Sequence, residues 1–218
     1  MKSRATLNIS ETFYSIQGES SYSGYPCLFI RLAGCNLRCS FCDARYTYEE
    51  PGQEMPVREL LAWAEATPRV MVEVTGGEPL LQEGVYPLLS GLLDAGRTVL
   101  LETNGSLSVS RVPAGVVKIM DLKCPDSNMH QRMDLANLAH LTPNDEIKFV
   151  LSSRRDYQWA TEMIEEHRLD KIANLAFSPV TPLLPPKVLA EWLMADRLPA
   201  RLQIQLHTLL WPDRNRGF

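Results

Sequence analysis

The chain has 218 residues, of which 45% are hydrophobic and 22% charged, with 22 Lys plus Arg against 26 Asp plus Glu. This composition is that of a globular protein and excludes a disordered, collagenous or disulfide-stapled chain. The formal net charge of −4 disfavours general nucleic-acid binding. No apolar run approaches the roughly 20 residues of a membrane helix, and the amino terminus lacks the apolar segment of a signal peptide. We therefore expect a cytoplasmic protein that binds neither nucleic acid nor membrane.

The predicted elements alternate between strands and helices. Apolar and β-branched runs predict the strands, and apolar residues at helical spacing predict the helices. Such alternation is typical of βαβ units, so we expect a single α/β domain over residues 1–218 with a mostly parallel sheet, and too few units for a closed eight-fold barrel. In chain order the elements are a strand at 28–32, a helix at 56–66, a strand at 69–74, a helix at 85–94, strands at 98–102, 116–121 and 145–151, a helix at 157–167, a strand at 173–177, a helix at 186–195 and a strand at 202–206.

Polar or glycine-rich segments follow five of the predicted strands. Because the carboxyl ends of parallel strands meet at one edge of a sheet, we expect the functional site there. Gly76 and Gly77 lack a Cβ and let the backbone approach a ligand closely, but they do not have the spacing of a dinucleotide or P-loop motif. The five segments are 33–45, 75–79, 102–105, 121–123 and 178–181.

Three of the five cysteines, Cys35, Cys39 and Cys42, lie within one short CxxxCxxC loop. An odd cysteine count in a reducing compartment disfavours disulfides. A [4Fe–4S] cluster usually takes four thiolates, so three in one loop would leave one iron open to a small molecule. Structural zinc usually takes two separated ligand pairs. A zinc site remains the alternative, with the fourth ligand drawn from His130, His140, His167 or His207.

These motifs resemble those of the radical S-adenosylmethionine (SAM) enzymes. The resemblance rests on the CxxxCxxC loop with Phe41 before its last cysteine, and on Gly76-Gly77-Glu78-Pro79 downstream. In that family a [4Fe–4S] cluster binds SAM at its open iron, and reductive cleavage yields a 5′-deoxyadenosyl radical that abstracts a substrate hydrogen. The resemblance implies a partial, (β/α)6-like barrel of the radical SAM type. It also implies three cluster ligands: Cys35, Cys39 and Cys42.

Nearly the whole chain resembles the 7-carboxy-7-deazaguanine synthase family, on segments 13–19, 29–39, 102–105, 146–150 and 203–207. That family converts 6-carboxy-5,6,7,8-tetrahydropterin into 7-carboxy-7-deazaguanine and releases ammonia. The product leads to queuosine in tRNA and to other 7-deazapurines. The resemblance also implies a homodimer, with flavodoxin or ferredoxin as the reductant.

The resemblance assigns site residues one by one. Arg31 is expected to pair with the substrate carboxylate, because a guanidinium matches a carboxylate with two parallel hydrogen bonds. The implied substrate-binding residues are Ile16, Gln17, Gly18, Glu19, Arg31, Thr75, His207 and Phe218. The implied SAM-binding residues are Phe41, Asp43, Gly77, Glu78, Asp121, Leu122, Lys123, Ser178, Pro179, Val180 and Thr181.

One position departs from the family pattern. The family holds a magnesium ion with a Ser or Thr directly after the Cys-Asp pair, and this chain has Ala44 there. Alanine cannot supply the oxygen ligand that magnesium requires. Thr47 is the nearest hydroxyl downstream, Asp43 and the backbone are other possible ligands, and Arg45 could supply positive charge instead. We therefore expect weakened magnesium dependence.

Two other function classes are compatible with parts of the sequence. Activators of glycyl-radical enzymes share the CxxxCxxC and glycine-rich motifs but act on a protein. Segment 13–19 and Arg31 favour a small carboxylated substrate instead, since only such a substrate needs a buried cation. A non-catalytic electron-transfer module would supply a fourth protein ligand to the cluster.

Overall fold

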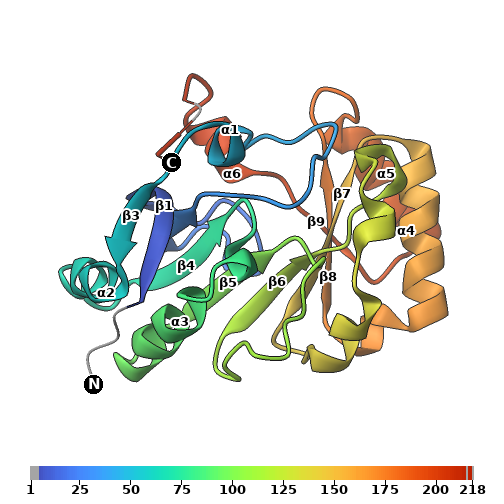
Figure 1. The fold of residues 1–218 in the computed structure, drawn as a ribbon. Helices are drawn as coiled ribbons and strands as arrows, with labels where there is room; N and C mark the ends of the chain where they lie inside the picture. The colour runs from blue at the N-terminus through green and yellow to red at the C-terminus, as the bar shows by residue number, and fades with distance from the viewer. Residues whose placement is uncertain (1–4, 215, 218) are drawn as a thin grey trace.

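The computed structural model describes residues 5–214, 216 and 217. Their nine strands form one sheet of order β3-β1-β2-β4-β5-β6-β7-β8-β9 (Figure 1). β1 (Thr6–Ile16) is antiparallel to β2 and β3, whereas each neighbouring pair from β2 to β9 is parallel. Within the described residues β3 and β9 are not paired, so the sheet is open. The predicted α/β class and mostly parallel, partial-barrel architecture are confirmed. The remaining strands are β2 Pro26–Leu32, β3 Gln53–Pro56, β4 Met71–Gly76, β5 Val99–Thr103, β6 Val117–Asp121, β7 Glu146–Leu151, β8 Asn174–Pro179 and β9 Arg201–Leu202.

Four helices cover the outer side of the sheet. Figure 1 shows α2 and α3 near one end of the sheet and α4 and α5 at the other. The shorter α1 and α6 belong to segments that line the pocket described below. The helices are α1 Tyr46–Glu49, α2 Val57–Glu65, α3 Val85–Asp94, α4 Arg154–His167, α5 Pro186–Asp196 and α6 Leu206–Leu210.

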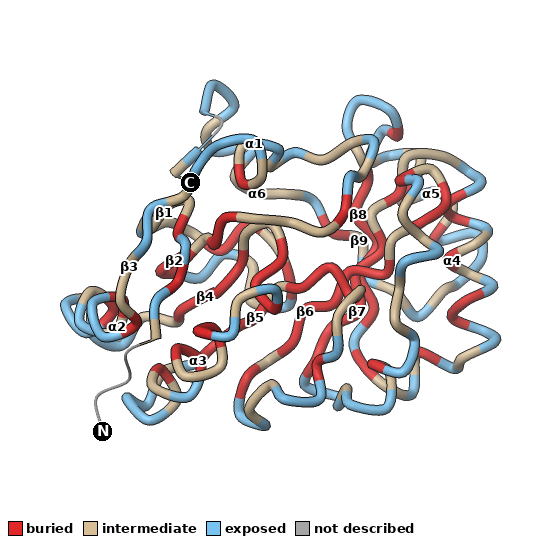
Figure 2. Tube along the Cα trace, in the orientation of Figure 1, coloured by how far each residue is buried: buried red, intermediate tan, exposed pale blue. Residues whose placement is uncertain are grey.

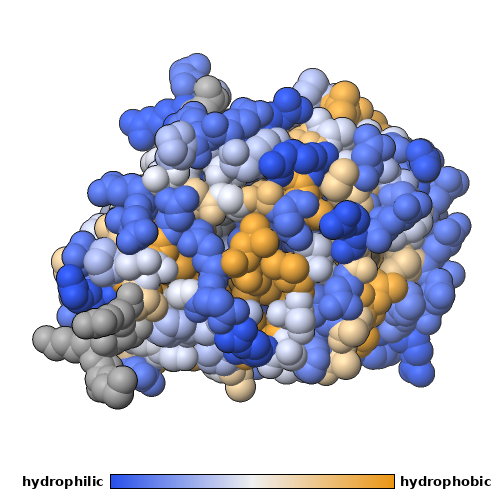
Figure 3. All heavy atoms as spheres, in the orientation of Figure 1, coloured by the Kyte–Doolittle hydropathy of each residue, from blue (hydrophilic) through white to orange (hydrophobic). Residues whose placement is uncertain are grey.

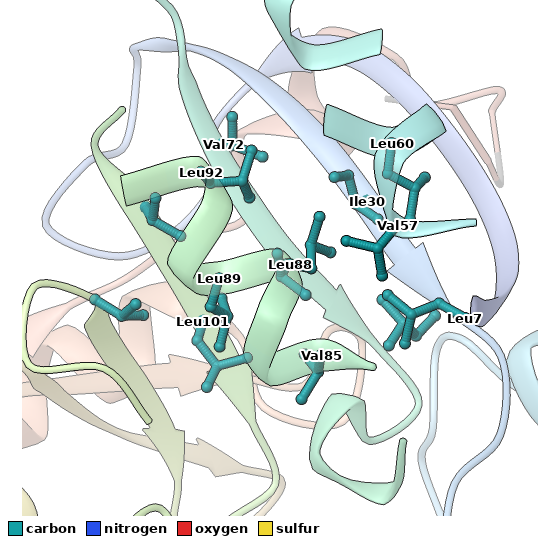
Figure 4. Close-up of a cluster of buried hydrophobic side chains, with 14 of the residues drawn as sticks. Leu7, Ile30, Val57, Leu60, Val72, Val85, Leu88, Leu89, Leu92 and Leu101 are labelled. Atoms are coloured by element: carbon teal, nitrogen blue, oxygen red, sulfur yellow. The ribbon is translucent and has the colours of Figure 1, made fainter. Parts of the chain in front are cut away.

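The helix-covered side of the sheet holds the hydrophobic core. Successive strand residues point to opposite faces, so every second side chain packs under the helices, and Figure 2 shows buried residues concentrated along the central strands. The first cluster, shown in Figure 4, includes Leu7, Ile30, Val57, Leu60, Val72, Val85, Leu88, Leu89, Leu92 and Leu101. The second cluster joins β6–β8 to α4 and α5 and includes Met120, Ile147, Phe149, Leu151, Tyr157, Phe177 and Leu189.

The opposite side of the same strands carries polar and charged side chains into a pocket. These residues alternate in sequence with the core residues, as the period of two requires. The strand pattern therefore decides both the core and the site. The strand residues on this side that line the pocket are Phe29, Arg31, Glu73, Thr75, Glu102, Ile119, Asp121, Lys148 and Val150.

The prediction of a carboxyl-terminal strand at 202–206 is wrong. Only Arg201 and Leu202 pair with β8, and Leu206 begins helix α6. The apolar-polar alternation has another cause, because the Gln203 and Gln205 side chains both donate to Glu19 and the Leu206 N–H donates to the Gly18 carbonyl. The segment therefore binds the loop after β1 instead of extending the sheet.

Other elements also differ from the sequence prediction. The prediction contained neither helix α1 nor the strands β1 and β3, which form the antiparallel end of the sheet. Helix α4 begins three residues earlier than predicted, because the Ser153 hydroxyl caps it by accepting from the Asp156 N–H.

Figure 3 shows a central hydrophobic patch on one face of the molecule, surrounded mainly by hydrophilic residues. None of the helices in the described part of the chain is both long and apolar enough to cross a membrane.

Candidate active site

A pocket of about 240 Å³ lies at the carboxyl ends of β2 and β4–β7. It is the part of the fold where the strand-end segments were predicted to meet. The predicted substrate residues that line it are Ile16, Gln17, Gly18, Glu19, Arg31, Thr75 and His207. The predicted cofactor and cluster residues that line it are Cys35, Cys39, Phe41, Cys42, Asp43, Gly77, Asp121 and Lys123.

Other predicted residues lie outside this lining. Glu78 is fully buried, and its carboxylate accepts hydrogen bonds from the Leu80 N–H, the Asn104 N–H and the Thr103 hydroxyl. Leu122 is buried in the second core cluster. Ser178, Pro179, Val180 and Thr181 lie at the end of β8, one strand beyond the lining residues of β7. Phe218 falls outside the described residues. The binding roles of these residues stay predictions.

The cysteine loop is seated against the end of β4 by Gly76 and Gly77. A Cβ on Gly76 would collide with the Leu32 carbonyl oxygen, and Gly76 adopts φ +138°, which favours glycine. A Cβ on Gly77 would collide with the Gly34 carbonyl oxygen and lie 2.8 Å from the Cys35 Cβ. The sequence predicted that the backbone approaches a ligand here, and that stays a prediction. The structure shows a close approach to the cysteine loop.

The three thiols of the cysteine loop border one pocket. Cys35, Cys39 and Cys42 are free and partly exposed. In a [4Fe–4S] cluster each thiolate binds a separate iron, so three thiolates leave one iron open. The donor set that borders this pocket fits such a cluster.

Lys148 is the central cation of the pocket. Its side chain is 5% exposed, and its Nζ lies 2.9 Å from Glu19, 3.5 Å from Asp121 Oδ1 and in contact with Glu102. Burial alone would lower the pKa of Lys148, but the charges of Asp121, Glu102 and Glu19 outweigh it and hold the pKa well above its usual value. Lys148 therefore stays charged and joins three strand-end segments.

The carboxylates around Lys148 have divergent pKa values. Burial favours a neutral Glu102, but the Lys148 charge and hydrogen bond lower its pKa to about 2. Glu73 is fully buried, and burial together with the charges of Glu102 and Glu19 raises its pKa to about 8. The Gln17 side-chain amide donates to Glu73. Near neutral pH the pocket thus contains an ionised Glu102 and a largely protonated Glu73.

Arg31 presents part of its guanidinium to the pocket. Its Nε donates to Glu11 Oε1 at 2.8 Å, across the antiparallel β1–β2 pair, and the Tyr46 hydroxyl donates to the same oxygen at 2.9 Å. The side chain is 18% exposed. Since Glu11 engages Nε, the terminal nitrogens remain for an anionic ligand.

The carboxyl-terminal segment borders the pocket on another side. A Cβ on Gly18 would lie 2.8 Å from His207 Nδ1, so Gly18 permits close contact with α6. Burial lowers the pKa of His207, which favours the neutral imidazole. Farther along, Arg216 pairs with Glu50 and stacks on Tyr46. This segment therefore covers the loop after β1 and reaches helix α1.

Several lining residues received no role from the sequence: Glu73, Glu102, Lys148 and Tyr46. Two of them lie in segments 102–105 and 146–150, which matched family motifs without an assigned function. The sequence did contain a signal for two of these residues, because Glu73 and Lys148 each interrupt an apolar strand. Burying a charge is costly unless it is paired, so a charged residue in such a strand indicates an ion pair or a functional site.

We expect Gly77→Ala to disturb the cysteine loop, because the added methyl would overlap the Gly34 carbonyl and Cys35. Reconstitution with iron and sulfide should then load the variant to well under half of the wild-type content. Gly115→Ala is the matched control, since its Cβ would meet only flexible Leu93 methyl groups at 3.2 Å. Equal iron content in the two variants would contradict the role assigned to Gly77.

The raised pKa of Glu73 predicts a pH dependence of stability. A carboxyl whose folded pKa exceeds its unfolded value makes folding less favourable as pH rises from about 4.5 to about 8. Glu73→Gln mimics the neutral acid and should reduce that fall in the free energy of unfolding, measured by urea denaturation across this range. Glu54→Gln, at an exposed position on β3, is the control. Parallel pH profiles for wild type and Glu73→Gln would refute the assignment.

Comparison with known proteins places these features in a family. Residues 29–168 match the model of the Radical SAM superfamily. The chain is 47% identical to 7-carboxy-7-deazaguanine synthase of Chlorobaculum tepidum, over 100% of both chains, and 38% identical to that of Clostridium acetobutylicum, over 96% of this chain and 98% of the relative.

Solved structures show the same fold. The crystal structure of QueE from Escherichia coli superposes with a TM-score of 0.76 at 24% identity, covering 92% of this chain and 94% of that one. Radical SAM enzymes use a [4Fe–4S] cluster and SAM, and the three thiols at this pocket fit that cofactor set. The chain belongs to the 7-carboxy-7-deazaguanine synthase family of the radical SAM superfamily.

Proposed function

We propose that this chain converts 6-carboxy-5,6,7,8-tetrahydropterin into 7-carboxy-7-deazaguanine with release of ammonia, as a radical SAM carbon–nitrogen lyase. One observation carries the proposal: a single pocket is lined by the three thiols, by Gly77 and by the Arg31 cation. Family membership at 47% identity over the full chain supports the same reaction. The product would enter queuosine or another 7-deazapurine pathway.

The cofactor sites follow from the pocket. Cys35, Cys39 and Cys42 would hold the [4Fe–4S] cluster, and the Gly77 backbone beside Cys35 would lie next to SAM. When bound, the cluster and SAM together supply the radical that removes a substrate hydrogen. Asp121 Oδ1 is buried and accepts no hydrogen bond in the described structure, so it offers an acceptor to a bound ligand.

The chain's own residues would bind and orient the pterin. The free end of the Arg31 guanidinium would take the substrate carboxylate, while Gln17 and Glu19 approach from the loop after β1. Lys148 positions Glu19 and Glu102 at the floor of the pocket. His207 borders the pocket from helix α6 and would close it over the pterin.

The glycyl-radical activator is the less favoured function. Such an enzyme must admit a protein backbone, whereas this pocket is small. Lys123 and Lys148 are paired with carboxylates of the pocket, but Arg31 is bound to Glu11 through Nε only, so its terminal nitrogens suit a small carboxylated substrate. We further propose that the chain works in the cytoplasm as a homodimer of single radical SAM domains, with flavodoxin or ferredoxin as electron donor.

The experiment that tests the function is anaerobic turnover of reconstituted, reduced protein with SAM, with and without the pterin, followed by mass spectrometry. We expect 7-carboxy-7-deazaguanine only when the pterin is present. Arg31→Met should lower kcat/KM about 10- to 100-fold, because a hydrogen bond to a charged group contributes about 1.5–3 kcal/mol. The kcat/KM of Arg31→Lys should lie between those of the wild type and Arg31→Met. Deoxyadenosine formation without the deazaguanine would reject this substrate.

Magnesium should stimulate turnover weakly. Ala44 offers no oxygen side chain, and the Thr47 hydroxyl is buried and donates to the Ala44 carbonyl at 2.7 Å. Arg45 is not among the lining residues of the pocket. We expect removal of Mg²⁺ with EDTA to change turnover less than about twofold, and Ala44→Thr to increase the Mg²⁺ response. Strong stimulation of the unmodified protein would contradict this.

A further inference from the structure

We propose that Asn104 raises the reduction potential of the [4Fe–4S] cluster by donating a side-chain hydrogen bond to the sulfur of Cys35. This role differs from binding substrate or SAM, because it acts on the charge of the cluster itself. The inference rests on the cluster of the proposed function, but it does not depend on which substrate the chain converts.

Asn104 directly follows β5 and places its side-chain amide against the cysteine loop. The residue is buried, and its Nδ2 lies 3.8 Å from Cys35 Sγ and 3.0 Å from Asn36 Oδ1. The Leu37 N–H donates to the same sulfur at 3.4 Å. Cys35 Sγ therefore accepts from one backbone donor of its own loop and from one side-chain donor of a neighbouring strand end.

A closed ring of hydrogen bonds decides which end of the Asn104 amide faces the sulfur. Ser106 donates to Asn104 Oδ1 from its N–H at 3.0 Å and from its hydroxyl at 2.6 Å. Asn36 Nδ2 donates to the Ser106 hydroxyl at 2.8 Å, and Asn36 Oδ1 accepts from Asn104. A backbone N–H can only donate, so the atom that it contacts must be the amide oxygen of Asn104. The NH₂ group is therefore the end turned towards Cys35.

Glu78 holds the backbone at Asn104 from the end of β4. The Glu78 carboxylate is fully buried and accepts from the Asn104 N–H at 2.7 Å and from the Thr103 hydroxyl at 2.9 Å. The Glu78 N–H donates to the Gly34 carbonyl of the cysteine loop at 2.9 Å. Glu78 therefore ties the strand end that carries Asn104 to the loop that carries Cys35, as outer groups around metal ligands commonly do.

A hydrogen bond to a cluster ligand changes the balance between the two oxidation states of the cluster. One-electron reduction adds a negative charge that spreads over the irons and sulfurs, and no bond forms or breaks. An N–H donor stabilises the more negative state more strongly, so the reduction potential rises. Burial strengthens this effect, because the local dielectric around a buried donor is low. Loss of the Asn104 donor should therefore make the cluster harder to reduce.

The experiment is a redox titration of the reconstituted, SAM-free protein with dithionite, followed by electron paramagnetic resonance of the reduced cluster. We expect Asn104→Ala to lower the ratio of reduced to oxidised cluster, at the wild-type midpoint potential, about three- to tenfold. For a one-electron couple this change corresponds to a shift of about 30–60 mV to more negative potential. Asn104→Asp keeps the shape but lacks the donor, so its potential should fall at least as far.

Ser106→Ala is the matched control, because it removes one hydroxyl of the ring while the Ser106 N–H still holds Asn104 Oδ1. Its ratio of reduced to oxidised cluster should change less than about twofold. Unchanged potentials in both Asn104 variants, or an equal shift in Ser106→Ala, would overturn the tuning role. Loss of the cluster from both Asn104 variants, with folding intact by circular dichroism, would also overturn it, since Asn104 would then be a structural residue of the loop.

The wild-type protein separates this inference from the proposed function. Failure of the cluster-loaded wild type to convert the pterin would overturn the proposed function alone, because the titration contains neither SAM nor pterin. Failure of the wild type to assemble a [4Fe–4S] cluster would overturn the proposed function and the tuning role together.

Discussion

The buried ammonium of Lys148 is the interaction on which the site depends. It holds Glu19 from the loop after β1, Glu102 from β5 and Asp121 from β6 around one charge. Removing one partner of such a buried group leaves an uncompensated charge, which costs about 3–5 kcal/mol. The contacts therefore impose a relative position on three segments far apart in sequence. The loop after β1 in turn holds the carboxyl-terminal residues, because Glu19 accepts from Gln203 and Gln205.

Charge and apolarity are separated by the two faces of one sheet. Glu73 and Lys148 point to the pocket, while Val72, Val74, Ile147 and Phe149 point to the helices. A shift of one residue in register would exchange these sets and bury the charges among apolar side chains. Burial of the apolar side chains therefore stabilises one register of the parallel strands. That register brings the charged side chains at the strand ends together.

The cysteine loop packs against the end of β4 through backbone contacts. Gly76 and Gly77 let the end of β4 touch Leu32 and Gly34 without a side chain between them. The loop then presents its three thiols to the pocket.

Local pattern was sufficient for much of the fold. Apolar runs located the parallel strands β2 and β4–β8, and helical periodicity located α2, α3 and α5, because these signals depend on residues close in sequence. The antiparallel strands β1 and β3 were not predicted, although Leu7 and Ile9 alternate with polar residues in β1; β3 is only four residues long. The segment at 202–206 was wrongly predicted as a strand. Its alternating glutamines, Gln203 and Gln205, donate hydrogen bonds to Glu19, which lies more than 180 residues away in sequence.

The sequence by itself determined which reactive groups are present: three thiols in one loop, a glycine pair and an arginine in an apolar strand, and their resemblance to a known family implied the cofactor set and a carboxylated substrate. Only the tertiary structure decided which groups meet. Lys148, Glu73 and Glu102 acquire their pKa values from burial and from one another, and both depend on distances between segments that no local pattern encodes. For the same reason the structure alone distinguished Arg31, which lines the pocket, from Arg45, which does not.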